Sequence, residues 1–276
     1  MIIAEYIKSI ILGIVEGITE WLPISSTGHL IIVNELMKAP GSFTVTEDFF
    51  PMYLYVIQLG AILAVCTLFF RKLNPFSPKK SREEKTATWQ MWFKVLVGVI
   101  PAGVIGLLLN DLMDAVETWQ VVSAMLIIYG IAFIVVERLP LKTNIADING
   151  MSYKTAFIIG LFQVLSIVPG TSRSGSTILG GRIAGCERAV AAEFSFFLAI
   201  PIMFGTTFIK LLKYDGIITS NQWGILITGF LVSYLVSLPI IRFLMSFVKK
   251  HSFTAFGWYR ILVGIVVIAF FTLTGF

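Results

Sequence analysis

Long apolar runs separated by short polar segments fill the whole chain of 276 residues. A transmembrane helix needs roughly 20 mainly apolar residues. We expect transmembrane helices at the six runs long enough to supply them: about 49–70, 89–110, 118–137, 188–213, 222–248 and 254–274. Because such runs recur along the full length with no polar domain between them, the pattern predicts one all-α polytopic membrane domain over residues 1–276.

Two further apolar runs are broken in the middle. Residues 2–37 are interrupted at "LPISS" and residues 152–184 at "VPGTSRSGS". Pro23 and Pro169 each remove a backbone donor and disfavour helix in the residue before them. We therefore expect each run to form a re-entrant hairpin, which is two short helices around a break. Non-helical backbone at membrane depth is tolerated only inside protein or beside water.

The charges of the loops indicate how the hairpins are oriented. Loop 71–88 is basic and loop 110–118 is acidic, so we expect the first in the cytoplasm and the second outside. The basic side chains of the first loop are Arg71, Lys72, Lys79, Lys80, Arg82 and Lys85. If residues 152–184 re-enter from the cytoplasm and residues 2–37 from outside, the basic segment "KKH" at 249–251 also falls inside. The two hairpins then have opposite orientations.

The two broken runs also resemble each other. A shift of 147 positions lays residues 13–32 on residues 160–179, and Glu16 on Gln163. Four of the aligned pairs are identical: Gly13 and Gly160, Ser25 and Ser172, Gly28 and Gly175, and Ile31 and Ile178. Opposed hairpins with breaks in matching places predict an inverted repeat with halves at about 1–137 and 138–276. Such repeats commonly build a site near the membrane midplane.

The composition agrees with a membrane protein. Apolar residues make up 57% and charged residues 13%, against about 45–50% and about 25% in soluble domains. The net charge of +5 lies mostly in loops, where it orients the protein in the membrane, so we expect no nucleic-acid partner. Cys66 and Cys186 are the only cysteines, and two lone thiols support neither a disulfide framework nor a zinc site.

The first break carries "EGITEWLPISSTGHL", residues 16–30. Glu16 and Glu20 are four residues apart and share one helix face. Adjacent carboxylates repel unless a cation or proton lies between them, and hard oxygen ligands suit magnesium or calcium. We predict that Glu16 and Glu20 hold a divalent cation, Mg²⁺ or Ca²⁺. The alternative is that both carboxylates face a water-filled vestibule.

A new helix after Pro23 points free backbone N–H groups and a positive dipole end at the break, which suits phosphate. We expect Ser26 and His29 to be catalytic. The expected phosphate ligands of this break are Ser25, Thr27 and Gly28. The alternatives are that the hydroxyls only cap the helix and that His29 is a core residue with satisfied hydrogen bonds.

The second break, "PGTSRSGST", forms a similar site. Arg173 offers a planar, permanently charged fork that matches phosphate oxygens, and we expect it to take part in catalysis. Its alternative role is a structural ion pair with Glu16 or Glu20. Thr171 or Ser172 can cap the new helix. The expected phosphate ligands of this break are Thr171, Ser172, Ser174, Gly175, Ser176 and Thr177.

"EGITEWLPISSTGHL" and "PGTSRSGST" closely resemble the two signature motifs of the undecaprenyl-diphosphate phosphatase family, the bacterial bacitracin-resistance proteins. The resemblance extends to "FSFFLAIP" and "FGWYRI" and covers essentially the whole chain. It implies a hydrolase of the bacterial inner membrane that converts undecaprenyl diphosphate to undecaprenyl phosphate and inorganic phosphate. That reaction recycles the lipid carrier of peptidoglycan synthesis. The resemblance also implies a need for a divalent cation and an active site facing the periplasm.

For that reaction, we expect Glu20 to act as general base for Ser26, which attacks the terminal phosphorus, while Arg173 neutralises the developing charge. These three residues and His29 should line one cavity near the membrane midplane that opens outward and sideways to lipid. His29 as the nucleophile and direct attack by a metal-bound water stay open.

A different function, transport or flipping of a phosphorylated polyprenyl lipid, fits inverted repeats around an anion site equally well. An anion channel fits less well, because two carboxylates lie at the site. The oligomeric state is open, with a homodimer among the possibilities.

Overall fold

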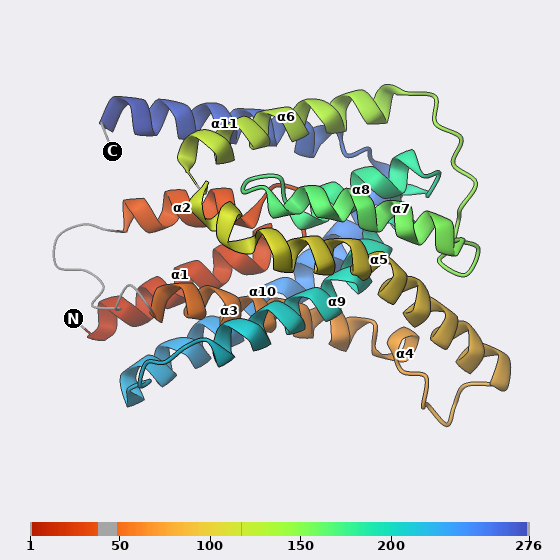
Figure 1. Cartoon of the computed structure of the whole chain (residues 1–276), viewed down its shortest axis with the longest axis horizontal. Helices are drawn as coiled ribbons and strands as arrows, with labels where there is room; N and C mark the ends of the chain where they lie inside the picture. Colours follow the sequence, from red (N-terminus) through yellow and green to blue (C-terminus); the bar gives the residue numbers. More distant parts are fainter. Residues whose placement is uncertain (1, 38–48, 117, 275–276) are drawn as a thin grey trace.

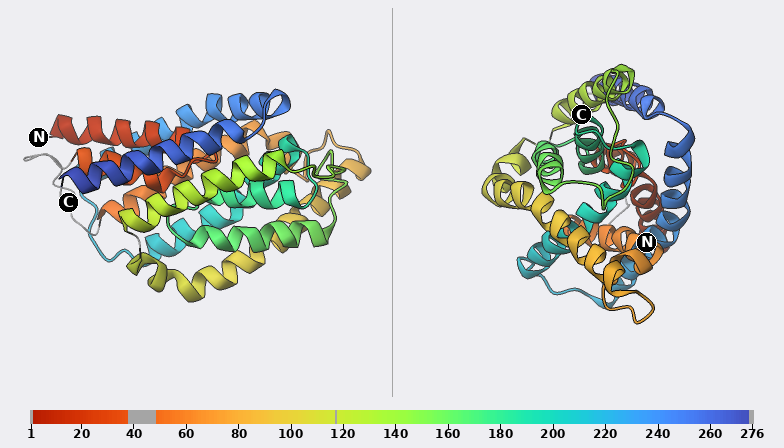
Figure 2. Two further views of the ribbon diagram at one scale, coloured as in Figure 1. Left: turned by 90° about the horizontal axis from the view of Figure 1, so that it is seen from above. Right: turned by 90° about the vertical axis from the view of Figure 1, so that its right-hand side faces the viewer.

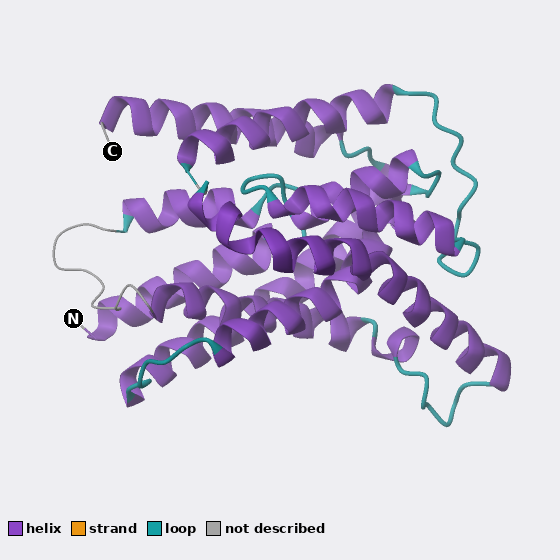
Figure 3. Cartoon of the chain, in the orientation of Figure 1, coloured by secondary structure: helices purple, strands orange, loops and turns teal. Residues whose placement is uncertain are grey.

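The computed structural model describes residues 2–37, 49–116 and 118–274. These residues form helices and connecting turns and contain no strand, which confirms the all-α class (Figure 3). The helices are α1 (Ile2–Thr19), α2 (Ser26–Leu36), α3 (Phe49–Leu68), α4 (Phe70–Leu73), α5 (Arg82–Ala115), α6 (Trp119–Arg138), α7 (Tyr153–Val164), the 3₁₀ turn η1 (Leu165–Ile167), α8 (Arg173–Ile183), α9 (Arg188–Leu212), α10 (Ser220–Lys250) and α11 (Thr254–Thr274).

Six of the described helices are long and apolar enough to cross a membrane. They cover Phe49–Leu68, Arg82–Leu109, Trp119–Arg138, Arg188–Leu212, Ser220–Lys250 and Thr254–Leu273. The six predicted spans are therefore confirmed, although α5 begins earlier than expected and continues to Ala115. Most of the segment predicted as loop 110–118 is thus helical, since nothing in "NDLMDA" is a glycine or proline that would stop a helix.

The outer faces of these helices are strongly apolar. Leu107, Leu235 and Leu262 are 71%, 60% and 60% exposed, and many other large apolar side chains are exposed as well. A protein surrounded by water rarely exposes apolar area on this scale. We conclude that lipid covers these faces and that the chain is a multi-pass membrane protein.

The two hairpins enter the bundle from opposite ends (Figure 1). Helix α1 runs inward and α2 returns to the same end, while α7 and α8 do the same from the other end. Seen along the bundle, α8 lies inside the ring of longer helices, and its residues from Ser174 to Arg182 are buried (Figure 2). Opposed hairpins were predicted from the loop charges. Their re-entry into a membrane stays a prediction.

Close contacts between helices repeat in the two hairpins. Helix α1 packs against α10, and α7 packs against α5. A Cβ atom on Gly13 would lie 2.8 Å from the Gly229 carbonyl oxygen, and one on Gly160 would lie 2.3 Å from the Gly98 carbonyl oxygen. Gly13 and Gly160 are one of the identical pairs of the 147-position shift. The division into two halves stays a prediction, and this repeated contact agrees with it.

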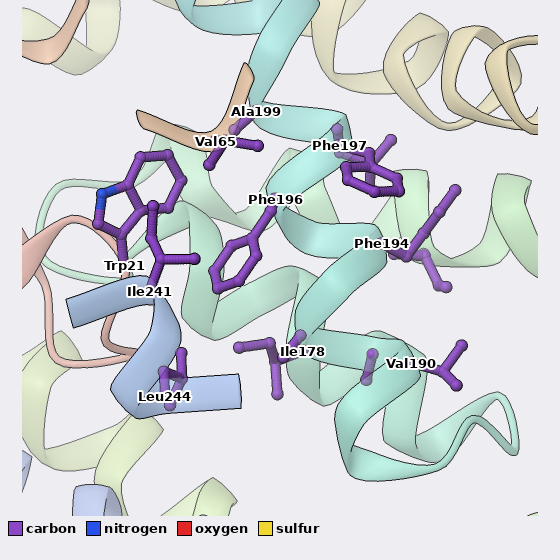
Figure 4. Close-up of a cluster of buried hydrophobic side chains, with 14 of the residues drawn as sticks. Trp21, Val65, Ile178, Val190, Phe194, Phe196, Phe197, Ala199, Ile241 and Leu244 are labelled. Carbon is purple, nitrogen blue, oxygen red and sulfur yellow. The ribbon is translucent and has the colours of Figure 1, made fainter. Parts of the chain in front are cut away.

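A large apolar cluster includes side chains of the first break and of α8 (Figure 4). Trp21 of the first break is fully buried, and its ring meets Phe196 of α9 edge-on, with ring centroids 5.3 Å apart. Figure 4 shows Trp21, Ile241 and Phe196 gathered at one side of this cluster. Aromatic pairs of this geometry contribute about 0.5–1.5 kcal/mol beyond their buried area. The turn between α1 and α2 is therefore fixed against α9.

Replacing Gly160 by valine should weaken the packing of α7 on α5, because the new Cβ atom would meet backbone atoms that cannot rotate away. We expect a loss of about 1–3 kcal/mol of stability, as for other overpacked sites. Gly103→Val on α5 is the matched control, since no described atom beyond its chain neighbours and its own helix backbone lies within 4 Å of its Cβ position. Thermal unfolding of both purified variants in detergent should show a lower midpoint for Gly160→Val alone.

Candidate active site

Each break ends in a serine with unusual backbone geometry. Ser25 has a φ of 72° and Ser172 a φ of 75°. The Ser25 hydroxyl accepts a hydrogen bond from the Gly28 N–H at 3.4 Å, and the Ser172 hydroxyl accepts one from the Gly175 N–H at 3.2 Å. Ser25 and Ser172 therefore cap α2 and α8. Residues other than glycine in such conformations cost about 1–3 kcal/mol and cluster at functional sites.

Glu20 connects the two breaks. Its Oε2 accepts a hydrogen bond from the Ser26 hydroxyl at 2.8 Å, and its Oε1 accepts one from Arg173 Nη2 at 3.0 Å. Ser26 is the first residue of α2 and Arg173 the first of α8, so both half-helices begin at this contact. The structure thus brings together Glu20, Ser26 and Arg173, three of the four predicted catalytic residues, although Glu20 and Arg173 are 153 positions apart in sequence.

Arg173 has further partners and one spare donor. Its Nη1 donates to the Ser195 carbonyl oxygen of α9 at 2.8 Å. Its Nε is buried and has no hydrogen-bond partner among the described residues. Its ion pair with Glu20 is one of the two pairs expected if Arg173 had only a structural role. Buried donors without a partner are rare in folded proteins, so the spare N–H is suited to an anionic ligand.

Glu16 lies one helical turn before Glu20 and is fully buried. Neither of its carboxylate oxygens has a hydrogen-bond partner in the described part of the chain. An ionised carboxylate in such a place needs a cation or must take up a proton. Within the described residues, no three His, Cys, Asp or Glu side chains gather as a metal site. Mg²⁺ is commonly held by only one or two carboxylates, with water and phosphate oxygens as its other ligands, so Glu16 and Glu20 fit that cation.

His29 is held at both ring nitrogens. Its Nδ1 lies 2.7 Å from the Ser25 carbonyl oxygen, and its Nε2 lies 2.8 Å from the Tyr259 hydroxyl. A carbonyl only accepts, so Nδ1 carries the proton and Nε2 of the neutral ring accepts from Tyr259. The two rings also stack, with centroids 5.6 Å apart. His29 therefore has no free ring nitrogen in this arrangement.

The other hydroxyls of the second break bind protein atoms. Ser174 donates to the Leu22 carbonyl oxygen of the first break at 3.3 Å. The remaining contacts are Thr171 to the Val168 carbonyl, Ser176 to the Tyr129 hydroxyl and Thr177 to the Ser195 hydroxyl. All four hydroxyl side chains are buried. They hold the turn in shape, and their role as phosphate ligands stays a prediction, as does that of half-buried Thr27.

Arg260 of α11 binds both breaks at once. Its Nη1 donates to the Pro23 carbonyl oxygen at 3.2 Å, and its Nη2 donates to those of Gly170 at 2.9 Å and Thr171 at 3.0 Å. The side chain is fully buried, and its guanidinium carbon lies 5.3 Å from the centroid of the Tyr129 ring. Broken helices leave carbonyl groups without helical partners, and buried carbonyls need donors. Arg260 supplies those donors and fixes one break against the other.

Sequence reasoning missed Arg260, Tyr259 and Ser195. The first two belong to "FGWYRI" and the third to "FSFFLAIP". Arg260 had a signal that was not used, because it is an ionisable residue inside the apolar run 254–274. Tyr259 and Ser195 had no comparable signal, since tyrosine and serine are common in membrane helices.

A cavity of about 520 Å³ lies on one side of Arg173, between α5 and α9. Arg173 is one of its lining residues. Of the four residues that we expected to line one cavity, Arg173 alone lines this one. Gln163, the counterpart of Glu16 in the second hairpin, also lines it.

Residues 9–266 match the family model described as "Bacitracin resistance protein BacA". Similar curated proteins are named "Undecaprenyl-diphosphatase". One from Limosilactobacillus fermentum is 54% identical over 275 residues, which is 98% of each chain. One from Leuconostoc citreum is 55% identical over 95% of each chain, and one from Enterococcus faecalis is 52% identical over 98% of this chain and 99% of its own.

Replacing Arg260 by lysine keeps the charge but leaves one ammonium group to serve carbonyls of both breaks. We expect turnover per folded molecule to fall by about a hundredfold, since a small misplacement of reacting groups costs that much. Arg182→Lys is the matched control, because Arg182 is also buried, in α8, but binds Glu137 and the Cys186 carbonyl, away from the breaks. Equal losses in the two variants, measured as phosphate release per folded molecule, would contradict the special role of Arg260.

Proposed function

The chain belongs to the BacA family of bacitracin resistance proteins, and we propose that it hydrolyses undecaprenyl diphosphate to undecaprenyl phosphate and inorganic phosphate at the meeting point of its two breaks. The contact of Glu20 with both Ser26 and Arg173 is the observation that carries this proposal. It places a hydroxyl, a carboxylate and a guanidinium together where two helix N-termini begin. The relatives that match the chain over nearly their full length are named for this activity, which supports the same reaction.

The proposed substrate accounts for polar groups deep in an apolar chain. Undecaprenyl diphosphate has a charged head and a long hydrocarbon tail, so the tail can stay among apolar groups while the head reaches the breaks. Two helix N-termini and Arg173 favour an anion there. The loop charges support a site reached from the outer face of a bacterial inner membrane.

In the first step, the Ser26 hydroxyl oxygen attacks the terminal phosphorus of the diphosphate. Its proton passes to Glu20 Oε2, which already accepts the hydrogen bond from this hydroxyl. The bond between the phosphorus and the bridging oxygen breaks as the bond from Ser26 forms. The departing lipid phosphate then takes up the proton from Glu20. Arg173, with its spare Nε–H, and the N–H groups of the half-helices stabilise the charge on the phosphoryl oxygens.

In the second step, water attacks the phosphorus of the phosphorylated Ser26. Glu20 accepts a proton from this water and returns it to the Ser26 oxygen as the phosphorus–oxygen bond breaks. Inorganic phosphate leaves and the site is restored. His29, held by Ser25 and Tyr259, has the role of orienting the break, and the engagement of both its nitrogens disfavours it as the nucleophile.

A divalent cation at Glu16 and Glu20 would supply positive charge to a pocket where two carboxylates meet a diphosphate. The two unpartnered oxygens of Glu16 support this assignment. Glu16 would hold and orient that cation. Ser26 makes the bond to phosphorus, Glu20 transfers the protons and Arg173 stabilises the charge.

Phosphate release by the purified chain in detergent tests the function directly. We expect release from undecaprenyl diphosphate, its loss in excess chelator, and its return with added magnesium or calcium. A transporter or flippase of the same lipid would release no phosphate where no membrane separates two sides. Full release after exhaustive chelation would remove the cation from the proposal and leave the hydrolysis intact.

Ser26→Ala should abolish the nucleophile, and we expect turnover to fall on the order of a thousandfold or more. Ser25→Ala, the neighbouring control, removes a cap that costs roughly 0.5–2 kcal/mol of stability and should retain far more turnover per folded molecule. Mass spectrometry of the protein quenched during turnover should find the phosphoryl group on Ser26. Its presence on His29 would reassign the nucleophile.

A further inference from the structure

The cavity beside Arg173 forms a groove between the middle of α5 and the second half of α9. Its volume of about 520 Å³ falls within the roughly 300–1,000 Å³ of small-molecule sites. The helix walls of this groove come from Val99 to Leu107 on α5 and from Pro201 to Lys210 on α9, with Lys213 directly after α9. Leu107 and Gly205 are exposed on the lipid-facing surface, so the groove opens sideways toward hydrocarbon.

Glycines line the middle of this groove without packing against anything. Apart from chain neighbours and the backbone of the same helix, no described atom lies within 4 Å of a Cβ built on Gly103 or Gly205, and Gly106 has only the end of the Ile167 side chain, at 3.9 Å. Glycines in membrane helices usually bring two backbones together, as Gly98 and Gly160 do here. Gly103 and Gly205 instead leave open space, and a glycine without such a contact costs helix stability.

The polar groups of the groove lie at its two ends. Arg173 and Gln163 are at the inner end, and Lys210 and Lys213 are at the other end, near the end of α9. The amide of Gln163 is 1% exposed, and neither its oxygen nor its nitrogen has a hydrogen-bond partner among the described residues. The Thr206 hydroxyl, in the middle, donates to the Ile202 carbonyl of its own helix. The middle of the groove therefore offers mainly apolar surface.

We propose that this groove binds the first isoprene units of the polyprenyl chain, with Gln163 donating to the phosphate that stays on the lipid. The inference rests on the proposed hydrolysis and adds where the hydrocarbon lies during it. Arg173 belongs both to the reaction site and to the groove, so a diphosphate at the breaks places its lipid end at the inner end of the groove. The Gln163 amide at that end has no partner among the described residues and can donate to such a ligand.

Bilayer phospholipid is a poorer occupant for two reasons. The open glycine surface gives room for the methyl branches of a prenyl chain, which straight acyl chains lack. The inner end also carries a guanidinium and an unpartnered amide at a depth that phospholipid headgroups do not reach.

Filling the groove should weaken binding of the polyprenyl part of the substrate and leave binding of its diphosphate head unchanged. We would make Gly103→Leu and Gly205→Leu separately and measure phosphate release from farnesyl diphosphate, which has three isoprene units. Inorganic pyrophosphate, tested as a competitive inhibitor, reports the head alone. We expect KM for farnesyl diphosphate to rise at least about tenfold in each variant, as for comparable changes in apolar pockets, with the inhibition constant of pyrophosphate unchanged.

Val104→Leu is the matched control, because Val104 follows Gly103 on α5 but is 55% exposed and does not line the groove. It should behave as the unsubstituted chain. An unchanged KM in both glycine variants would overturn the proposal. A joint rise of KM and the pyrophosphate constant would also overturn it, since the groove would then bind the head.

A photoreactive farnesyl diphosphate analogue, with a diazirine on its chain, tests the groove without turnover. We expect labelled peptides from α5 and α9, and loss of that label in Gly103→Leu. If the unsubstituted chain released no phosphate yet showed this labelling, the hydrolysis would fail and the groove would stand. Labelling elsewhere, or labelling displaced by phospholipid but not by excess farnesyl diphosphate, would sink the proposal.

Discussion

One buried guanidinium holds the two halves of the active site together. Two helices broken inside an apolar bundle leave carbonyl oxygens that no water can reach, and each needs a donor. Arg260 donates to carbonyls of both breaks and lies against the ring of Tyr129. These bonds from Arg260 to both breaks are called the clamp below. The clamp sets the distance between Ser26 and Arg173, because each residue begins the helix that leaves its break. The contact of Glu20 with both side chains depends in turn on that distance.

The site built on this clamp separates two kinds of chemistry. Charged and polar groups gather where the half-helices begin, and the open glycine surface starts beside Arg173. An amphiphilic lipid can then keep its head at the breaks and its chain in the groove.

The sequence was sufficient to predict the architecture but not the contacts that complete it. Apolar run lengths determined the six spans, and two prolines with capping residues located both hairpins. Glu20, Ser26 and Arg173 could be named because polar groups in such runs are costly. Arg260 could have been suspected for the same reason, but its partners are backbone carbonyls, which have no identity in a sequence. The groove also could not be predicted, since the sequence does not distinguish Gly103, which has open space beside it, from Gly98, which packs closely.

The bonds from Arg260 to the first break can form only late in synthesis of the protein. Arg260 lies in α11, the last helix of the described chain, and its partner Pro23 lies in the first hairpin. Chains emerge from the ribosome N-terminus first, at about 5–20 residues per second. The first hairpin must therefore wait more than ten seconds before its guanidinium partner exists. If Arg260 is needed to align the breaks, a nascent chain that already carries Ser26 and Glu20 gains its aligned site only once α11 has joined the bundle, so we expect a chain truncated before α11 to be inactive.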